Sequence, residues 1–207
     1  MFARVLRKKF KANTPIFTEE ILETFKEYSR PRIFQLLTES LDNGSIIKYD
    51  YGVYYIPNRN ELGISSISFD QVIEKKYLCN KKKIYGFLGK SYIYKLFGLS
   101  YGDEVIEIIT NNESSIKRIV CIKNRNVILH KTRCKITNQN INVYLLLELL
   151  TEFDIKKYNN DLEFRNKVHE FIKTKKITKN KITNMMKYFP KKTLKNYLES
   201  GLVDFRY

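Results

Sequence analysis

Cysteine and histidine are scarce in this chain, which has three Cys and two His among 207 residues. Cys79, Cys121 and Cys134 form no CxxC pair, and His130 and His169 stand far apart in the sequence. Structural zinc sites need several closely spaced Cys or His ligands, and disulfide frameworks need paired cysteines, so neither is expected. Unpaired thiols are typical of a reducing compartment. We therefore expect no metal and no cofactor.

Long apolar runs are also missing. The most apolar stretch, Val143 to Leu150, is too short to span a bilayer and is interrupted by Glu148. The first residues, MFARVLRKKFKAN, contain no apolar core of a signal peptide. The sequence therefore predicts a cytoplasmic protein without a membrane partner.

Basic residues are abundant, because 38 Lys and Arg against 22 Asp and Glu give a formal net charge of +16. Residues 1–65 carry 10 basic and 8 acidic side chains, residues 66–150 carry 14 and 7, and residues 151–207 carry 14 and 7. This excess favours a polyanionic partner. An AT-rich coding sequence, which enriches Lys, Ile, Asn and Tyr, is a second source of it. The hydrophobic fraction of 43% predicts folded domains.

Three helices are predicted in the first 45 residues of the chain. Apolar residues recur at helical spacing from Phe2 to Phe10. Thr18 has a typical capping side chain and predicts that a second helix starts after it. A third helix is predicted from Ser29 to Asn43, ended by Gly44. The apolar face of this third helix is expected to comprise Ile33, Phe34, Leu37 and Leu41.

A hairpin is predicted directly after the third helix. Its strand-like runs are Ile46 to Tyr49 and Val53 to Ile56, with Gly52 at the turn and Pro57 after the second strand. Helix, short strand, helix, helix and hairpin is the order of a winged helix, whose third helix enters the major groove while the hairpin touches the flanking backbone. The sequence therefore predicts a winged-helix DNA-binding domain over residues 1–57.

Candidate contacts to double-stranded DNA follow from this predicted geometry. Arg and Gln on the third helix suit base edges, and Lys and Tyr on the hairpin suit phosphates. The predicted DNA-binding residues are Arg30, Arg32, Gln35, Thr38, Lys48, Tyr49, Arg7, Lys8 and Lys11. Glu39 lies on the same predicted face and repels phosphate, so a unit that binds protein instead of DNA stays an alternative.

The rest of the chain predicts a second, larger domain. Residues 58–68 are polar and predict a linker. Residues 69–207 mix strand-like runs, at 105–110, 116–123 and 126–129, with helical runs that continue to the C-terminus. The predicted fold class is α+β, with an N-terminal winged helix followed by a mixed α+β domain that ends in helices.

The letters Gly89-Lys90-Ser91 are those that end a nucleotide-binding P-loop. A P-loop needs another glycine five positions before the second one, and Ile84 occupies that position here. The three residues are therefore predicted to form a turn and the start of a short helix that stops at Gly98. No nucleotide partner is expected.

The hairpin segment GSIIKYDYGVYYIPN resembles the pattern that closes the winged helix of AbiEi-type antitoxins, the antitoxin half of abortive-infection (type IV) toxin–antitoxin systems. The pattern is carried by Gly44, Ile46, Gly52, Tyr54 and Pro57.

Further landmarks of the family follow along the chain, so that the resemblance covers most of residues 14–200. They are a small-residue turn and helix with Gly89, Ser91 and Gly98-Leu99, then the segments VIEIITNN and KITNQNINVYLLLELL. At Asp50 the chain departs from the family, which often has a basic residue there.

The resemblance implies an antitoxin that acts in phage defence and is not an enzyme. Its winged helix would bind double-stranded promoter DNA and repress its own transcription. Residues 69–207 would form an antitoxin domain that counteracts a cognate nucleotidyltransferase-like toxin encoded next to it. Whether this domain contacts the toxin directly, or acts through the toxin's target, is left open by the resemblance.

Two other functions stay open at this point. A transcriptional regulator of a mobile element without a toxin partner would have the same N-terminal pattern. A metal-dependent nuclease could use Glu74-Lys75-Lys76, which fits the Glu-x-Lys end of such a site. No convincing partner aspartate precedes this segment on a predicted strand.

Overall fold

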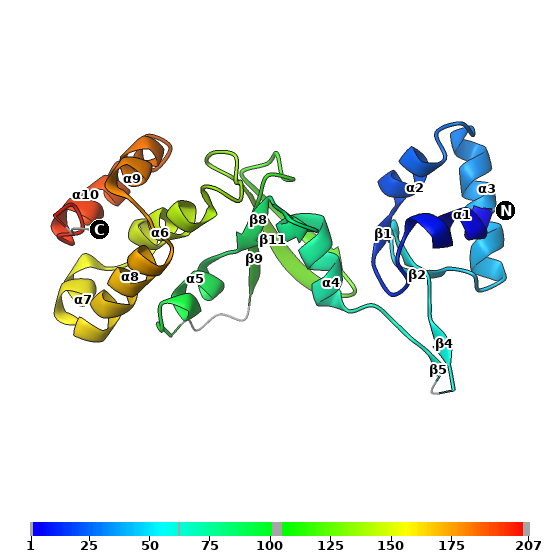
Figure 1. Cartoon of the computed structure of the whole chain (residues 1–207), viewed down its shortest axis with the longest axis horizontal. Coiled ribbons are helices and arrows are strands. Elements are labelled where there is room, and N and C mark those ends of the chain that lie inside the picture. The colour runs from blue at the N-terminus through cyan, green and yellow to red at the C-terminus, as the bar shows by residue number, and fades with distance from the viewer. Residues whose placement is uncertain (1, 62, 101–104, 205–207) are drawn as a thin grey trace. The chain divides into compact units, whose positions relative to one another are not determined.

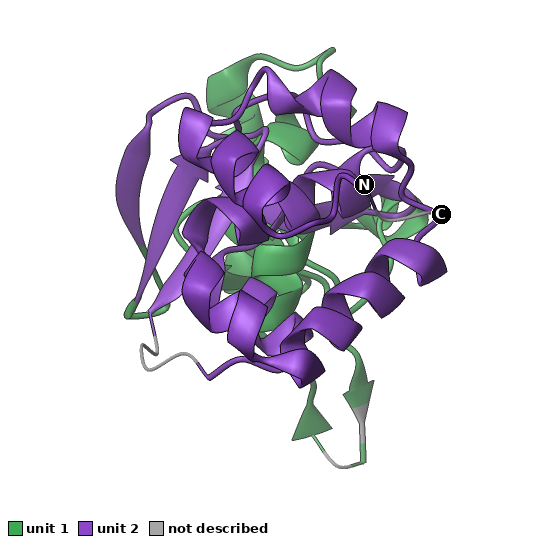
Figure 2. Cartoon of the chain, turned by 90° about the vertical axis from the view of Figure 1, so that its left-hand side faces the viewer, with its two compact units in different colours: residues 1–76, 121–125 green, residues 77–120, 126–207 purple. Residues whose placement is uncertain are grey.

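The computed structural model describes residues 2–61, 63–100 and 105–204 (Figure 1). The chain divides into two compact units, residues 1–76 with 121–125 and residues 77–120 with 126–207 (Figure 2). Helices and strands occur in both units, which confirms the α+β prediction.

The predicted domains divide the chain differently. The boundaries 1–57, 58–68 and 69–207 stay predictions, and the residues among them at positions 1, 62, 101–104 and 205–207 lie outside the described ranges. The segment predicted as a linker contains two short paired strands, β4 (Arg59–Asn60) and β5 (Gly63–Ile64). None of the described helices is long and apolar enough to cross a membrane.

Unit 1 has helices around a small antiparallel sheet. Its further elements are α1 (Phe2–Lys9), β1 (Ile16–Phe17), α2 (Thr18–Thr24), α3 (Arg30–Asp42), β2 (Ile47–Asp50), β3 (Val53–Tyr55) and α4 (Phe69–Ile73), which continues into a π-helical turn at Glu74–Leu78. The three-stranded sheet has the order β1-β3-β2, and both pairs are antiparallel. The predicted order of helix, short strand, helix, helix and hairpin is therefore present.

The first helices and the sheet share one apolar core. Leu6 of α1, Ile21 of α2 and Leu37 of α3 are buried in it together with Ile16 and Ile56. Because these residues recur at the helical or strand period, each element presents one apolar side to the others. This packing determines which side of α3 stays exposed.

Two details of the predicted helices were wrong. Helix α2 is capped one residue earlier than predicted, at Phe17, whose backbone N–H donates to Glu20 Oε2 at 2.9 Å. This is the backward hydrogen bond of a capping box, while the hydroxyl of Thr18 donates to the Gly52 carbonyl at 3.4 Å and does not cap the helix. Phe34 was assigned to the buried side of α3 but is 37% exposed, and Leu36 is half-buried instead.

Unit 2 is built on a four-stranded sheet followed by five helices. Its elements are β6 (Cys79–Asn80), β7 (Lys83–Ile84), β8 (Gly86–Leu88), α5 (Lys90–Leu96), β9 (Ile106–Thr110), β10 (Lys117–Ile122), β11 (Arg125–Lys131), α6 (Ile141–Glu152), α7 (Ile155–Asn160), α8 (Leu162–Thr174), α9 (Lys179–Met186) and α10 (Lys191–Glu199). The strand order is β10-β11-β9-β8, in which β9 is parallel to β11 and antiparallel to β8. Figure 2 shows the turn between β10 and β11 in the colour of unit 1, because residues 121–125 belong to that unit.

Helix α6 is the central element of the unit 2 core. Nearly all its side chains are buried, since α5, α9 and α10 pack around it. Tyr144 meets Phe87 of the sheet edge-on with ring centroids 5.5 Å apart. At its far end, Asn196 of α10 donates to the Leu150 carbonyl at 2.7 Å, which satisfies a polar group inside an apolar contact.

Gly89 forms the turn between β8 and α5, and Lys90 and Ser91 begin the helix, as predicted. Gly89 is required by close approach, because a Cβ there would lie 2.8 Å from the Cβ of Glu107. Its N–H donates to the Glu107 carbonyl at 2.7 Å and so joins the turn to β9. Lys90 forms an ion pair with Glu152 of α6 at 2.9 Å.

A nearly buried carboxylate on α6 is paired with the segment that precedes the helix. Glu148 accepts a hydrogen bond from Arg133 Nε at 2.9 Å, and its side chain is 7% exposed. Burial raises the pKa of Glu148, and the Arg133 guanidinium opposes this rise. The raised pKa means that Glu148 favours folding most when protonated, and that this contribution is lost as the pH rises through the folded pKa.

Arg133→Ala is expected to lower the free energy of unfolding by about 2 kcal/mol at pH 7, because an unpaired carboxylate is left in the core. The pKa of Glu148 should rise further without its partner. The loss should therefore shrink at pH 4.5, where the carboxyl takes up a proton in the folded state. Urea unfolding at both pH values measures this, with Arg133→Lys as the charge-preserving control. An equal loss at the two pH values would contradict a role for the Glu148 charge.

Candidate nucleic-acid interface

The exposed side of α3 carries three of the four residues predicted to read DNA from this helix. The helix begins after Ser29, which is extended, and Pro31 occupies its first turn, where its missing N–H costs nothing. Ile33, Leu37 and Ser40 are buried. The opposite side is exposed and comprises Arg32, Gln35, Thr38 and Glu39, whereas Arg30 is exposed as the first residue of the helix.

Arg32 and Gln35 are already held against each other on this surface. Arg32 Nη1 donates to Gln35 Oε1 at 2.7 Å, and Arg32 lies 4.0 Å from the Glu39 carboxylate. Both ends of the ion pair are about half-exposed, with side-chain exposures of 47% and 54%. These contacts hold the Arg32 guanidinium along the helix. Because they are exposed to solvent, breaking them costs little free energy.

The two outer members of the set are engaged locally. Thr38 Oγ1 donates to the Phe34 carbonyl at 3.0 Å, so that its hydroxyl is left as an acceptor. The Arg30 guanidinium lies 5.7 Å from the centre of the exposed Phe34 ring. The exposed ring of Phe34 thus offers its face to this cation.

The hairpin of β2 and β3 presents a second group of polar side chains. Gly52 has φ 69°, as its turn requires, and its carbonyl accepts the N–H of Thr18 at 3.0 Å. Lys48 is exposed, with its Nζ 5.9 Å from the centre of the Tyr51 ring. Tyr51 is 91% exposed at the turn. The sequence interpretation missed Tyr51, although its position next to the turn glycine was a usable signal.

A turn from distant sequence packs against this hairpin within unit 1. Asp50 accepts the N–H of Tyr51 at 2.7 Å through Oδ1 and the N–H of Lys123 at 2.8 Å through Oδ2. The ammonium group of Lys123 lies 5.1 Å from the centre of the Tyr49 ring. Asp50, the position that departs from the antitoxin pattern, therefore anchors a lysine beside the hairpin.

Lys123 could not be predicted as part of this surface, because 73 residues separate it from Asp50. The same turn carries Arg125, whose guanidinium lies 5.0 Å from the centre of the Phe69 ring. Tyr49 itself is a neutral hydrogen-bond donor at ordinary pH, since burial raises the pKa of its phenol. The hairpin region thus holds more basic groups than the predicted Lys48.

The third predicted group lies on and after α1. Arg7, Lys8 and Lys11 are exposed, while Phe2 stacks on Phe25 with ring centroids 4.3 Å apart and Leu6 is fully buried. Cations in the last turn of a helix are favoured by its dipole. Within the described ranges, no hydrogen bond, ion pair or cation–π contact joins these three cations to α3 or to the hairpin.

The segment considered for a nuclease is engaged in packing within unit 1. Lys75 Nζ donates to Glu20 Oε2 at 2.7 Å and to the Pro15 carbonyl at 2.6 Å, and its side chain is 19% exposed. Among the residues that the structure describes, no group of three or more His, Cys, Asp or Glu side chains could hold a metal ion.

No family model matches this chain, and neither a curated protein nor a solved structure matches it.

Proposed function

We propose that unit 1 is a winged helix that binds double-stranded promoter DNA, with α3 in the major groove. The observation that carries this proposal is the exposed row on α3, where Arg32, Gln35 and Thr38 face solvent while Ile33 and Leu37 anchor the helix. The order of elements and the β1-β3-β2 sheet support it. Lys48, Tyr51 and Lys123 would contact phosphates beside the recognition helix.

The chemistry of the row suits base readout. An Arg fork pairs with the O6 and N7 atoms of guanine, and a Gln amide pairs with the N6 and N7 atoms of adenine. In the free protein Arg32 donates to Gln35 and faces Glu39. Binding to a matching site exchanges these exposed contacts for base contacts, whereas at a mismatched site they persist. The arrangement therefore favours specific over indiscriminate binding.

We propose that the whole chain is the antitoxin of an abortive-infection, type IV toxin–antitoxin system. It would repress its own promoter through unit 1 and counteract a nucleotidyltransferase-like toxin through its larger part. This proposal rests on the pattern at Gly44, Ile46, Gly52, Tyr54 and Pro57. In the structure Gly44 and Gly52 have φ of 66° and 69°, so both glycines of the pattern occupy left-handed positions. The protein would work in the cytoplasm without a cofactor and would catalyse no reaction.

Co-expression with the adjacent reading frame tests the proposal. We expect the neighbouring protein alone to arrest growth, the full-length chain to restore it, and the chain to repress a reporter driven by its own promoter. Restored growth without repression would contradict the DNA-binding role. Repression beside a harmless neighbour would instead favour a mobile-element regulator without a toxin. The Lys75→Ala variant is the control for a loss of packing in unit 1. Lys75 pairs with Glu20 and is not among the candidate DNA-binding residues.

A further inference from the structure

The sheet of unit 2 is only partly covered on the side that faces α5 and α6. Helix α5 packs against β8 and β9, and Phe87 and Ile109 join the helical core there. The outer strand β10 is not covered in this way. Ile119 on β10 is 63% exposed, and Ile116 just before the strand is 87% exposed. An apolar surface of this kind on a regular strand is a candidate contact site.

The outer edge of β10 is also open for hydrogen bonding. β10 is the terminal strand of the order β10-β11-β9-β8, and no strand of the described residues pairs with its other edge. It is six residues long and contains no proline. Such an edge presents a row of backbone N–H and C=O groups on which an extended chain can add a strand.

A charged groove lies over the neighbouring strands of the sheet and reaches β10 at Lys117. It has a volume of about 390 Å³ and is formed by residues of α5, α6, β9 and β11 and the start of β10. Two ion pairs line it, Lys90–Glu152 and Arg133–Glu148, both at 2.9 Å, and His130 Nε2 lies 3.8 Å from the carboxylate of the third acid, Glu107. Each acid in the lining therefore has a basic side chain of the lining beside it.

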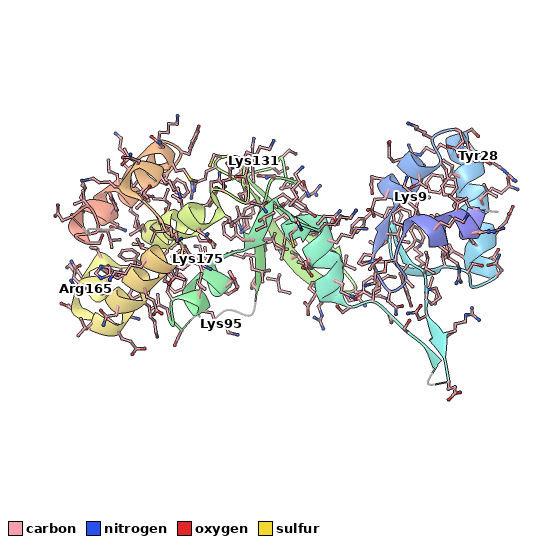
Figure 3. The ribbon with its side chains drawn as sticks, in the orientation of Figure 1. Lys9, Tyr28, Lys95, Lys131, Arg165 and Lys175 are labelled. Atoms are coloured by element: carbon pink, nitrogen blue, oxygen red, sulfur yellow. The ribbon has the colours of Figure 1, made fainter. Side chains whose placement is uncertain are left out.

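Two further lysines in the groove lining have no such match. Lys117 and Lys131 are both exposed, and within the described part of the chain no carboxylate lies within 4.0 Å of either ammonium group. Figure 3 labels Lys131 at the end of β11, where its N–H donates to the Ser115 carbonyl at 3.2 Å. Lys117 and Ile119 share one face of β10, because side chains alternate along a strand. The uncompensated charge thus lies next to the exposed apolar side chain and the open edge.

We propose that the outer edge of β10 and the adjoining groove bind an acidic, extended segment of a partner protein by strand addition. The partner's backbone pairs with β10, its carboxylates meet Lys117 and Lys131, and its apolar side chains cover Ile116 and Ile119. This interaction surface goes beyond the proposed function, since it depends on neither promoter binding nor the identity of a toxin. It is named the β10 edge surface below.

Charge and chemistry select this occupant over two others. A second copy of the chain would bring Lys117 and Arg118 against the same cations and carries a net charge of +16, so edge-to-edge pairing between copies is opposed. A nucleic acid would meet the lysines, but its backbone has no N–H and C=O groups at the spacing of a strand edge. An acidic peptide strand satisfies the cations, the edge and the isoleucines at once.

A labelled peptide of ten residues that alternates Glu and Val is the probe for the β10 edge surface. We expect it to bind the full-length chain in a fluorescence anisotropy titration at low salt. The double variant Lys117→Glu/Lys131→Glu should bind it at least about tenfold more weakly, because two attractive contacts become repulsive. The matched control is Lys157→Glu/Lys192→Glu, which makes the same charge change at exposed positions of α7 and α10 and should lose less than about threefold.

Strand addition is tested separately from charge. The same peptide with alternate backbone amides N-methylated should lose binding, because one edge can no longer pair. Ile119→Thr keeps strand propensity and should weaken the unmodified peptide by about three- to tenfold. It serves as the second variant if the double lysine variant loses its native circular dichroism spectrum.

Several outcomes would overturn the proposal. These are absence of peptide binding to the wild-type chain, equal losses in the lysine variant and its control, or unchanged binding of the N-methylated peptide. Tighter binding of a ten-nucleotide single strand than of the peptide, lost in the same lysine variant, would assign the surface to nucleic acid instead. Self-association that disappears in Ile119→Thr would assign it to a second copy.

Discussion

Arg32→Ala and Gln35→Ala are each expected to weaken binding to the chain's own promoter by about 1–3 kcal/mol, or about 5- to 150-fold. Binding to random DNA should hardly change, because non-specific affinity comes from phosphates. The reason lies in the exposed row of α3, where these two side chains are the ones able to pair bidentately with bases. Gel-shift titrations with the full-length chain on both DNAs measure the difference. Lys191→Ala on α10 is the control for general loss of charge.

The two effects should not add. Because Arg32 donates to Gln35 at 2.7 Å, removing either side chain also frees the other to move. We expect the double variant to lose less than the sum of the single losses. Equal losses on promoter and random DNA would reassign both residues to phosphate contacts. No loss on either DNA would remove α3 from the interface and leave the unit as a protein-binding module.

Gly86→Ala is expected to lower the free energy of unfolding by about 3 kcal/mol, the upper end of what overpacking costs. A Cβ on Gly86 would lie 2.0 Å from the carbonyl oxygen of Tyr77 and 2.8 Å from that of Ile109. Tyr77 belongs to the π-helical turn and Ile109 to β9, so both atoms are backbone oxygens that cannot move away as a flexible side chain could. A lowering of the thermal midpoint by about 6–12 °C should follow.

Gly201→Ala is the matched control for this glycine substitution. Gly201 has φ 71° and nothing within 4 Å of a built Cβ, so that only the left-handed backbone is strained, at about 1 kcal/mol. Gly86→Ala should therefore be clearly the more harmful of the two. Equal thermal midpoints for the two variants would show that β8 moves away from Tyr77 and relieves the contact.

Local patterns were sufficient for much of unit 1. The predicted helix after Ser29, its end at Gly44 and the hairpin around Gly52 are all observed, because caps, turn glycines and apolar spacing act over a few residues. The exposed row of α3 followed from the same spacing. Phe34 is the exception, because it was predicted to be buried and is exposed. It lies at the border of the apolar face, and helical spacing does not show whether another element covers that border.

In unit 2 the sequence patterns of several short elements were too weak to predict them. The strands β6, β7 and β8 are two or three residues long, which is shorter than any period that a pattern can reveal. Helix α7 was not predicted, because its six residues, IKKYNN, contain only one buried side chain, Tyr158. These elements exist because the sheet and the helical core pack around them and satisfy their backbone groups.

The sequence by itself determined the α+β class, the helices and hairpin of unit 1, and the candidate residues Arg30, Arg32 and Gln35. Only the tertiary structure decided that β9 lies between β8 and β11, that Lys123 lies against Tyr49, and that Lys117 and Lys131 line one groove. The physical reason is the range of the interactions. Helix caps and turns are local, whereas strand order and charge clustering depend on which distant segments bury apolar surface together.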